Sequence, residues 1–351
     1  MISIDPNRTI QKTLTTVRLF DGFWDRWIAH GMEKEVISQV KVSVRDISDW
    51  TNYFNYHAQA HTERAMLHKA SRDPKKAEKH FQLAGLYYNL MQWIYPDANE
   101  EKVWWYKKSI DSFKAADQFS NFNYFKEQLT INGGEVVGRV RPLENPKGII
   151  IIVNPIDSSK EELFTYEKHF LELGYLTISF DGPGQGETYI FNRIKATRDR
   201  WEQFLNVLID YASEKFPNLP IFLFGTSSGA RWSIAASRHP MIKKAIAVSP
   251  AISEDISLPE YFVERTQFIS DQSSHMLPDI HELTKCKPIF VFHGNKDVMV
   301  RDKDIYQLYH RLPSGKKLVV YEEETHCCNG KLKEIRAISA NWLMSNEEGK
   351  T

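Results

Sequence analysis

The spacing of apolar residues changes near residue 126, and this change divides the chain into two parts. Before it, apolar residues recur at intervals of three and four, which places them on one face of a helix. The clearest run comprises Ala77, Phe81, Ala84, Tyr88 and Met91. Asp73-Pro74 is typical of the start of that helix, and Pro96 marks its end. Similar stretches cover 51–71 and 98–119, so we predict an all-helical domain over residues 1–126.

After residue 126, short strands alternate with helices. Gly133-Gly134 separates two alternating segments and predicts a β-hairpin over 127–142. Nearly continuous apolar runs follow at Gly148–Asn154, Tyr175–Phe180, Ile221–Phe224, Lys244–Val248, Pro288–Phe292 and Lys317–Tyr321. Helical stretches separate most of them, at Glu161–Leu173, Asp199–Phe216 and Ser227–Arg238. Strands that are apolar on both faces and separated by helices indicate a mostly parallel sheet with helices on both faces. We therefore predict an α/β domain over residues 127–351.

Composition and charge narrow the class of protein. Hydrophobic residues make up 42% and charged residues 26% of the 351, as in an ordinary globular chain of about two domains. The 45 Lys and Arg balance 45 Asp and Glu, so the basic excess typical of nucleic-acid binding is missing. We find neither the run of about 18 apolar residues that a membrane span needs nor a secretory signal pattern. Three cysteines without a C-x-x-C motif suit a reducing cytoplasm.

Gly225-Thr226-Ser227-Ser228-Gly229 is the most informative motif. It lies between a predicted strand and a predicted helix, the setting in which G-x-S-x-G presents a nucleophilic serine. The glycines let the chain close tightly around Ser227, and the helix start directs backbone N–H groups at a developing oxyanion. A plain small-residue turn would show the same glycines, but the flanking elements favour Ser227 as the nucleophile.

A nucleophilic serine needs a base, and the base needs an orienting acid. In sheets that carry this motif, the three follow in the order Ser, Asp or Glu, His. Asp297 lies in the loop after the seventh predicted strand, and His326 in the loop after the last. Both loops belong at the same sheet edge as the serine. We predict a triad of Ser227, His326 and Asp297; Asp302 is the alternative acid, but it lies well past the strand end.

Two backbone amides should stabilise the oxyanion. One is the amide of Ser228, directly after the nucleophile. The other should come from the loop after the third predicted strand, where we nominate the amide of Ile156, with that of Asp157 as the alternative. Ser158-x-x-Glu161 in the same loop also fits a helix-capping box, which explains its polar residues structurally.

Three further patterns carry less weight. The run DGPGQGE over residues 181–187 lacks the dinucleotide-binding spacing G-x-G-x-x-G, so we expect a tight loop at the rim of the site. His57 and His61 share a helix face, but without a third ligand we predict no metal site. Cys327-Cys328 is strained for a disulfide, and packing beside the catalytic loop is the simpler role.

These motifs together resemble one group of α/β-hydrolases, the family of 2,6-dihydroxypseudooxynicotine hydrolase, the fungal yellowish-green pigment polyketide hydrolases and the fermentation–respiration switch protein. The resemblance rests on the serine motif, on residues 73–88 in the helical part, and on DSSKEE (157–162), FDGPGQGE (180–187) and HCCN (326–329). It covers most of residues 70–345. Asn154-Pro155 stands where members commonly have glycines, which reshapes the oxyanion loop, and Ala230 replaces a frequent glycine.

The resemblance implies an α/β-hydrolase fold whose helical domain caps the catalytic site. It also implies hydrolysis of carbon–carbon bonds beside ketones, or of esters, in small aromatic or polyketide-type molecules. The resemblance implies no cofactor and no metal. Because members are often dimers, a homodimer is expected. Ser227 would attack the carbonyl, His326 would take its proton, Asp297 would orient His326, and water would release the acyl group.

Three alternatives remain open. A general esterase, thioesterase or peptidase would use the same triad, and an acyltransferase would replace water by another acceptor. A binding or regulatory protein would use the scaffold without catalysis, although the intact triad argues against this.

Aromatic residues are concentrated in the helical part, which holds six of the nine tryptophans. If this part is a lid, some of its aromatic side chains contact an aromatic or polyketide substrate. The candidates are Trp93, Trp104, Trp105 and Tyr106. For most of them, packing in the core of the helical domain is the simpler interpretation.

Overall fold

The computed structural model describes residues 4–252, 258–271 and 276–345. Contacts divide the chain into two compact units. The helical unit comprises Met1–Tyr124, Glu161–Thr165 and Pro259–Ile269, and the α/β unit comprises Phe125–Lys160, Tyr166–Leu258 and Ser270–Thr351. Two short segments from beyond residue 126 thus pack with the N-terminal helices, which the change of periodicity near that residue did not indicate.

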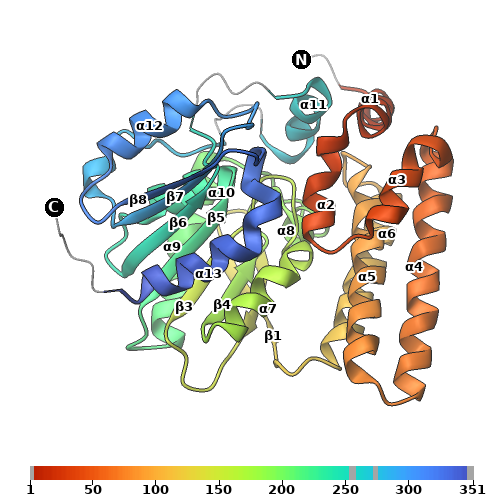
Figure 1. The fold of residues 1–351 in the computed structure, drawn as a ribbon, viewed down its shortest axis with the longest axis horizontal. Coiled ribbons are helices and arrows are strands. Elements are labelled where there is room, and N and C mark those ends of the chain that lie inside the picture. The colour runs from red at the N-terminus through yellow and green to blue at the C-terminus, as the bar shows by residue number, and fades with distance from the viewer. Residues whose placement is uncertain (1–3, 253–257, 272–275, 346–351) are drawn as a thin grey trace. The chain divides into compact units, whose positions relative to one another are not determined.

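The helical unit contains a long hairpin and several shorter helices (Figure 1). Its α-helices are α1 (Pro6–Leu19), α2 (Asp25–Ala29), α3 (Lys34–Ser43), α4 (Ile47–Ala70), α5 (Pro74–Trp93), α6 (Glu100–Asp117) and α11 (Glu260–Ile269), with a 3-10 turn at Asp21–Trp24. The predicted start of α5 is confirmed, because the Asp73 carboxylate caps the amide of Lys76 and Pro74 begins the helix. All five apolar residues of the predicted face, from Ala77 to Met91, are buried.

The α/β unit is built on one eight-stranded sheet with the order β1-β2-β4-β3-β5-β6-β7-β8. The strands are β1 (Phe125–Ile131), β2 (Gly134–Arg141), β3 (Ile149–Val153), β4 (Leu176–Phe180), β5 (Ile221–Thr226), β6 (Ile242–Val248), β7 (Ile289–Gly294) and β8 (Lys317–Tyr321). The first two form the predicted hairpin and pair antiparallel, as does β2 with β4, whereas the remaining pairs are parallel. The predicted mostly parallel sheet is confirmed.

Helices cover both faces of this sheet. They are α7 (Phe164–Glu172), α8 (Gly186–Ile190), α9 (Arg198–Lys215), α10 (Ser228–Ala236), α12 (Asp302–Arg311) and α13 (Leu332–Leu343), with 3-10 turns at Lys160–Leu163, Leu283–Lys285 and His326–Lys331. On one face, Ile151 and Leu223 share a core with residues of α9 and α12. On the other, Phe224 contacts the ring of Phe170 in α7 and Phe290 that of Trp342 in α13.

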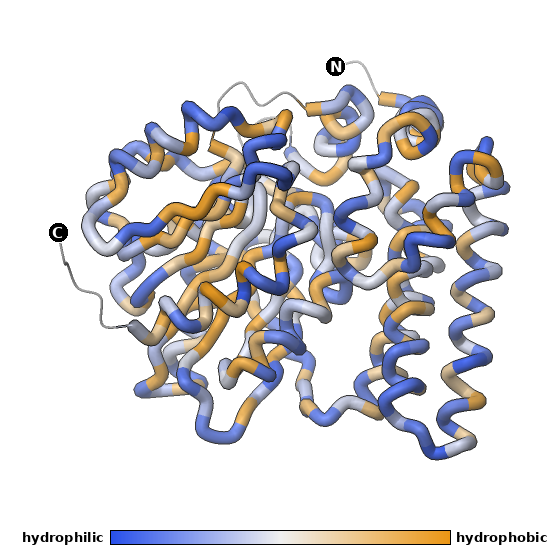
Figure 2. Tube along the Cα trace, in the orientation of Figure 1, coloured by the Kyte–Doolittle hydropathy of each residue, from blue (hydrophilic) through white to orange (hydrophobic). Residues whose placement is uncertain are grey.

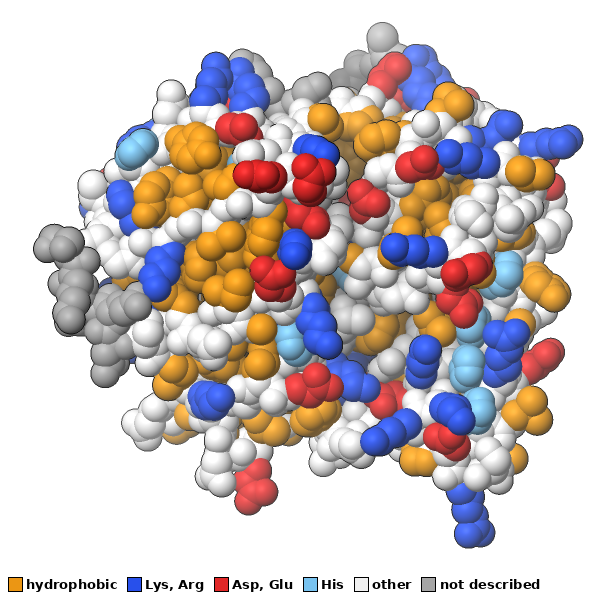
Figure 3. Space-filling model, in the orientation of Figure 1, with side chains coloured by type: hydrophobic (Ala, Val, Ile, Leu, Met, Phe, Trp, Pro, Cys, Tyr) orange, Lys and Arg blue, Asp and Glu red, His pale blue; other side chains and the backbone are white. Residues whose placement is uncertain are grey.

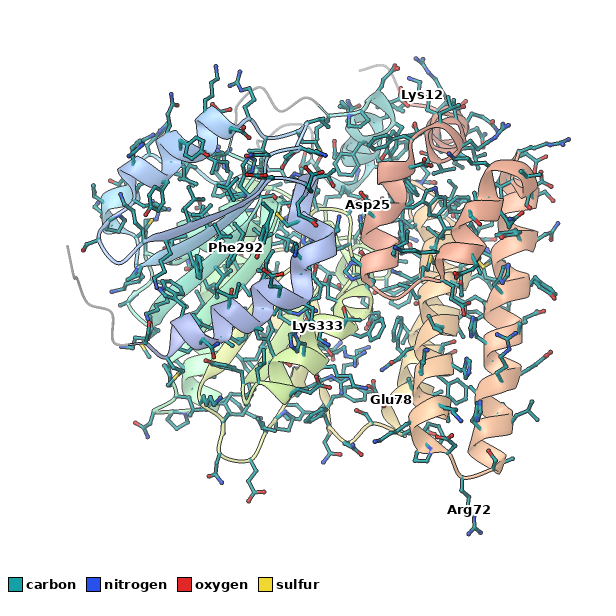
Figure 4. All side chains as sticks on the ribbon, viewed as in Figure 1. Lys12, Asp25, Arg72, Glu78, Phe292 and Lys333 are labelled. Carbon is teal, nitrogen blue, oxygen red and sulfur yellow. The ribbon has the colours of Figure 1, made fainter. Side chains whose placement is uncertain are left out.

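Burial on both faces explains why the central strands are mostly apolar. All five residues of β3 are buried, and so are all six of β5 and of β7. The central strands accordingly hold many of the hydrophobic positions in Figure 2. Phe292 near the end of β7, labelled in Figure 4, is fully buried and precedes the loop that carries Asp297. The sheet is therefore a rigid base for the loops at its carboxyl edge.

Candidate active site

Ser227 occupies the sharp turn between β5 and α10. Its backbone has φ 53° and ψ −120°, a conformation that costs a non-glycine residue about 1–3 kcal/mol. A Cβ atom at Gly225 would lie 2.2 Å from the carbonyl oxygen of Gly229, and one at Gly229 would lie 2.2 Å from that of Val153. Both positions therefore require glycine, and together they let the turn press against the end of β3.

His326 joins the serine to a carboxylate. Its Nε2 lies 2.8 Å from Ser227 Oγ, and its Nδ1 lies 2.7 Å from Asp297 Oδ2. The other carboxylate oxygen of Asp297 accepts hydrogen bonds from the amides of Met299 and Val300, at 2.8 and 3.0 Å. The structure thus brings the three predicted residues together. The hydroxyl, the imidazole and the carboxylate form a chain of hydrogen bonds suited to proton transfer.

The alternative acid, Asp302, has a different partner. Its carboxylate lies 2.7 Å from Nε2 of His293, a fully buried residue of β7. Asp302 begins α12, past the loop that carries Asp297. The geometry therefore favours Asp297 over Asp302 as the group that orients His326.

The surroundings of the two groups shift their pKa values in opposite directions. Burial raises the pKa of Asp297, but His326 and the two amides outweigh it, so the pKa of this carboxyl is lowered overall. Burial lowers the pKa of His326, but the adjacent Cys327 and the Asp297 carboxylate outweigh it and raise the pKa well above 6.5. An ionised carboxylate beside an imidazole that binds protons strongly is the pairing that a general base needs.

Ser249 anchors the loop that carries His326, a role that our sequence reasoning missed. It directly follows β6, is fully buried, and its hydroxyl accepts a hydrogen bond of 3.0 Å from the amide of Cys327. Cys327 and Cys328 both have left-handed backbone, with φ 68° and 48°, and both are free thiols. Because polar residues at the carboxyl ends of parallel strands meet at one edge, the position of Ser249 after a buried strand was an available signal.

The predicted oxyanion loop lies against the start of α10. The amide of Ile156 donates a hydrogen bond of 2.6 Å to Oγ of Ser228, so it is already engaged by a side chain. Asp157 has left-handed backbone, with φ 62°. Gln185 holds the loop from the other side, because its side-chain amide donates to the carbonyl of Pro155 over 2.7 Å. The run over residues 181–187 therefore supports this loop.

A buried ion cluster holds the first and last residues of the run 181–187, Asp181 and Glu187. Lys160 Nζ lies 2.7 Å from Asp181 Oδ2 and 2.8 Å from Glu187 Oε1, and all three residues are less than a tenth exposed. Burial raises the pKa of Glu187, but the Lys160 and Lys126 ammonium groups outweigh it and lower the pKa overall. Each charge is thus compensated, which is what burial of ions demands.

The four nominated aromatic residues have different surroundings within the helical unit. Trp93 is buried beneath the guanidinium of Arg265, 3.7 Å from its ring centre, and Tyr106 is fully buried with its hydroxyl 2.7 Å from Glu161 Oε2. Trp105 is half-buried and stacks on Tyr88, whereas Trp104 is 56% exposed. Their contact with a substrate remains a prediction.

The histidine pair of α4 is part of a larger cluster. The two Nδ1 atoms of His61 and His80 lie 2.9 Å apart, and His61 Nε2 lies 2.9 Å from the Glu33 carboxylate. His57 and His61 both stack on Tyr87. Figure 3 shows histidines gathered over the hairpin of α4 and α5. Within the described ranges, no group of three or more His, Cys, Asp or Glu side chains is arranged to hold a metal ion.

Cationic and anionic residues are equal in number in the sequence, and both kinds are visible on the surface. On the face drawn in Figure 3, cationic and anionic side chains are interspersed. None of the helices in the described part of the chain combines the length and hydrophobicity needed to cross a bilayer.

The chain is similar in sequence to known hydrolases. The family model "Serine aminopeptidase, S33" matches residues 144–272. The chain is 23% identical over 339 residues to 2,6-dihydropseudooxynicotine hydrolase of Paenarthrobacter nicotinovorans, covering 91% of this chain and 90% of that protein. It is 32% identical over 106 residues to 20-hydroxy-prefusarin hydrolase FUS2 of Gibberella moniliformis, covering 28% of this chain and 25% of the relative.

Solved structures support the same assignment at the level of the fold. The 2,6-dihydroxy-pseudo-oxynicotine hydrolase aligns with a TM-score of 0.75 at 20% identity, over 91% of this chain and 94% of the other. AbyA5 aligns with a TM-score of 0.67 at 13% identity, over 88% and 94%. The mostly parallel sheet, the N-terminal helical region and these matches together show that the chain has the α/β-hydrolase fold, and the similarity to named hydrolases supports a hydrolytic enzyme.

Proposed function

We propose that this hydrolase forms an acyl-enzyme on Ser227, and that it cleaves either a carbon–carbon bond next to a ketone or an ester. The observation that carries the proposal is the position of the His326 imidazole, 2.8 Å from Ser227 Oγ and 2.7 Å from Asp297 Oδ2. Ser227 Oγ attacks the carbonyl carbon while His326 Nε2 takes its proton. Asp297 holds Nδ1 and stabilises the imidazolium.

The second half of the reaction depends on the leaving group. In an ester, His326 returns the proton to the alcohol oxygen. In a β-diketone, the leaving group is an enolate, and the adjacent ketone stabilises its charge until His326 protonates the carbon. Water then attacks the acyl-enzyme with His326 as base.

The choice of substrate class rests on resemblance. The relative named for 2,6-dihydropseudooxynicotine matches along 91% of this chain, and several shorter matches are to fungal hydrolases, including the one named for 20-hydroxy-prefusarin. This supports a small aromatic or polyketide-type substrate over a peptide, although the matching family model is described as a serine aminopeptidase.

Intact-protein mass spectrometry tests both parts. The protein is incubated separately with aryl β-diketones, aryl esters and amino-acid aryl amides, and the mass of a covalent adduct identifies the acyl half of an accepted substrate. Ser227→Ala should abolish both the covalent adduct and labelling by a fluorophosphonate. It should also lower turnover by several orders of magnitude. Ser237→Ala removes a buried hydroxyl from the same helix region and is the matched control. Full turnover by Ser227→Ala would contradict the acyl-enzyme mechanism.

A further inference from the structure

The side-chain hydroxyl of Ser228 lies between the two loops that should stabilise the oxyanion. It accepts the hydrogen bond of 2.6 Å from the amide of Ile156, and Ser228 is only 7% exposed. The amide that would serve as the second oxyanion donor is therefore already satisfied by a side chain. Asp157, the alternative, has left-handed backbone in the same tight loop.

The packing of the two loops keeps this hydrogen bond in place. Val153 at the end of β3 pairs with Gly225 in β5, so the loops that follow the two strands begin side by side. Gly229 lets them approach closely, since a Cβ atom there would overlap the carbonyl oxygen of Val153. On the other side, Gln185 ties the carbonyl of Pro155 by a hydrogen bond of 2.7 Å. Turning the Ile156 amide away from Ser228 would require this loop to move.

The chemistry of a hydroxyl gives Ser228 a second use. A serine hydroxyl accepts up to two hydrogen bonds and donates one. Its oxygen here accepts from Ile156, and its proton has no acceptor among the residues that the structure describes. An amide that donates to the oxygen polarises the O–H group and strengthens it as a donor.

We propose that Ser228 is a catalytic residue that stabilises the oxyanion with two groups, its backbone amide and its side-chain hydroxyl. This rests on the proposed function of Ser227. When Ser227 Oγ bonds to the carbonyl carbon, the π electrons of the carbonyl move to its oxygen and the serine proton moves to His326. The Ser228 O–H donates a hydrogen bond to that oxygen and keeps its own proton. Ile156 acts through the hydroxyl rather than on the substrate.

Substitution of Ser228 separates this arrangement from direct donation by Ile156. Hydrolysis of p-nitrophenyl butyrate is compared for the native protein, Ser228→Ala, and the nearly isosteric Ser228→Cys, whose S–H is a weak donor. Loss of one oxyanion donor costs about 10²–10³ in kcat, so Ser228→Ala should lower kcat by about that factor with little change in KM. Ser228→Cys should lower kcat in the same way, by at least about tenfold. The affinity of a trifluoromethyl ketone, which forms a tetrahedral adduct on serine, should fall in parallel.

The opposite result would overturn the proposal. If Ile156 is the direct donor, Ser228→Ala frees its amide, and kcat stays the same or increases. A loss confined to KM, or a native kcat in Ser228→Cys, would also overturn it. Ser237→Ala should retain native kcat and inhibitor affinity, because its hydroxyl donates to the carbonyl of Ile234 within the chain. Failure of the nucleophile assignment is a separate result, seen as turnover in Ser227→Ala.

Discussion

The hydroxyl of Ser249, at the end of β6, accepts a hydrogen bond of 3.0 Å from the amide of Cys327, the residue next to His326. Cys327 and Cys328 form two successive left-handed positions, so the chain around the imidazole is held in a conformation that ordinary residues avoid. Ser249 itself has positive φ, 44°, and is fully buried. A strained residue after one strand thus supports a strained turn after another.

Ser249→Ala should impair catalysis more than binding. The substitution leaves the part-buried amide of Cys327 without its acceptor, which costs up to about 1–3 kcal/mol, and loosens the turn that places His326. We expect kcat for p-nitrophenyl butyrate to fall by about tenfold with KM nearly unchanged, and urea unfolding to show the loss of stability. Ser339→Ala is the matched control, because Ser339 is fully buried and its hydroxyl lacks a partner in the described residues. Equal effects of the two substitutions would contradict a role for Ser249 in positioning.

The rate should increase with pH through neutrality. His326 accepts the serine proton only when neutral, and its pKa is raised well above 6.5, so the active fraction grows as pH increases through that raised value. Cys327→Ala removes one of the contacts that raise the pKa, and the rising limb of kcat/KM should shift to lower pH. Cys286→Ala, which changes a buried cysteine elsewhere in the α/β unit, should leave the profile unchanged. A profile that stays put in Cys327→Ala would show that its sulfur does not act on the imidazole.

Lys160→Met should destabilise the α/β unit strongly. It leaves the buried carboxylates of Asp181 and Glu187 without their shared cation, and breaking a buried ion pair on one side costs about 3–5 kcal/mol. The free energy of unfolding in urea measures the loss. Lys76→Met provides the comparison, because Lys76 is largely exposed beside Asp73 and its loss should cost less than about 1 kcal/mol.

Acid should destabilise the helical unit through its histidines. Burial lowers the pKa of His80 to about 4, with His61, His68 and nearby cations adding to the effect. Between its usual pKa of 6.5 and about 4, the unfolded chain binds more protons than the folded one, so stability decreases as pH falls through this range. His80→Gln should flatten the dependence of the thermal midpoint on pH between 7 and 4.5, while the same change at exposed His281 should not. An unchanged slope in His80→Gln would contradict this assignment.

The sequence predicted those parts of the site that depend on strand order. The alternating segments around Gly133-Gly134 located β1 and β2, and apolar runs located β3 to β8. The loops after β5, β7 and β8 then had to meet at one edge. Contacts between side chains of distant segments were not accessible in the same way. Lys160 and Glu187, or Ser249 and Cys327, are ordinary polar residues until the fold brings them together. The competition of the Ser228 hydroxyl for the Ile156 amide likewise depends on distances that no pattern encodes.

Membership of the helical unit was harder to predict, because periodicity identifies an apolar face but not the neighbour that covers it. Glu162 looked like part of a helix of the α/β domain. It is buried in the helical unit, where Arg26 Nη2 lies 2.7 Å from its carboxylate. Burial raises the pKa of Glu162, but Arg26 and His30 outweigh it and lower the pKa to about 2. Arg265 likewise stacks on Trp93 from a segment more than 170 residues away.

This discontinuity limits how the protein can be dissected or re-engineered. Separating the chain at residue 124 would not release an intact helical unit. It would remove Arg26 from its contact with Glu162 and Trp93 from its contact with Arg265. Glu162 and Arg265 would then lack these partners in the remaining part. Exchanging the helical unit with that of a relative would require three segments to be replaced together, residues 1–124, 161–165 and 259–269. Substitutions in either short segment alter the helical unit, although both segments lie beyond residue 126 in the sequence.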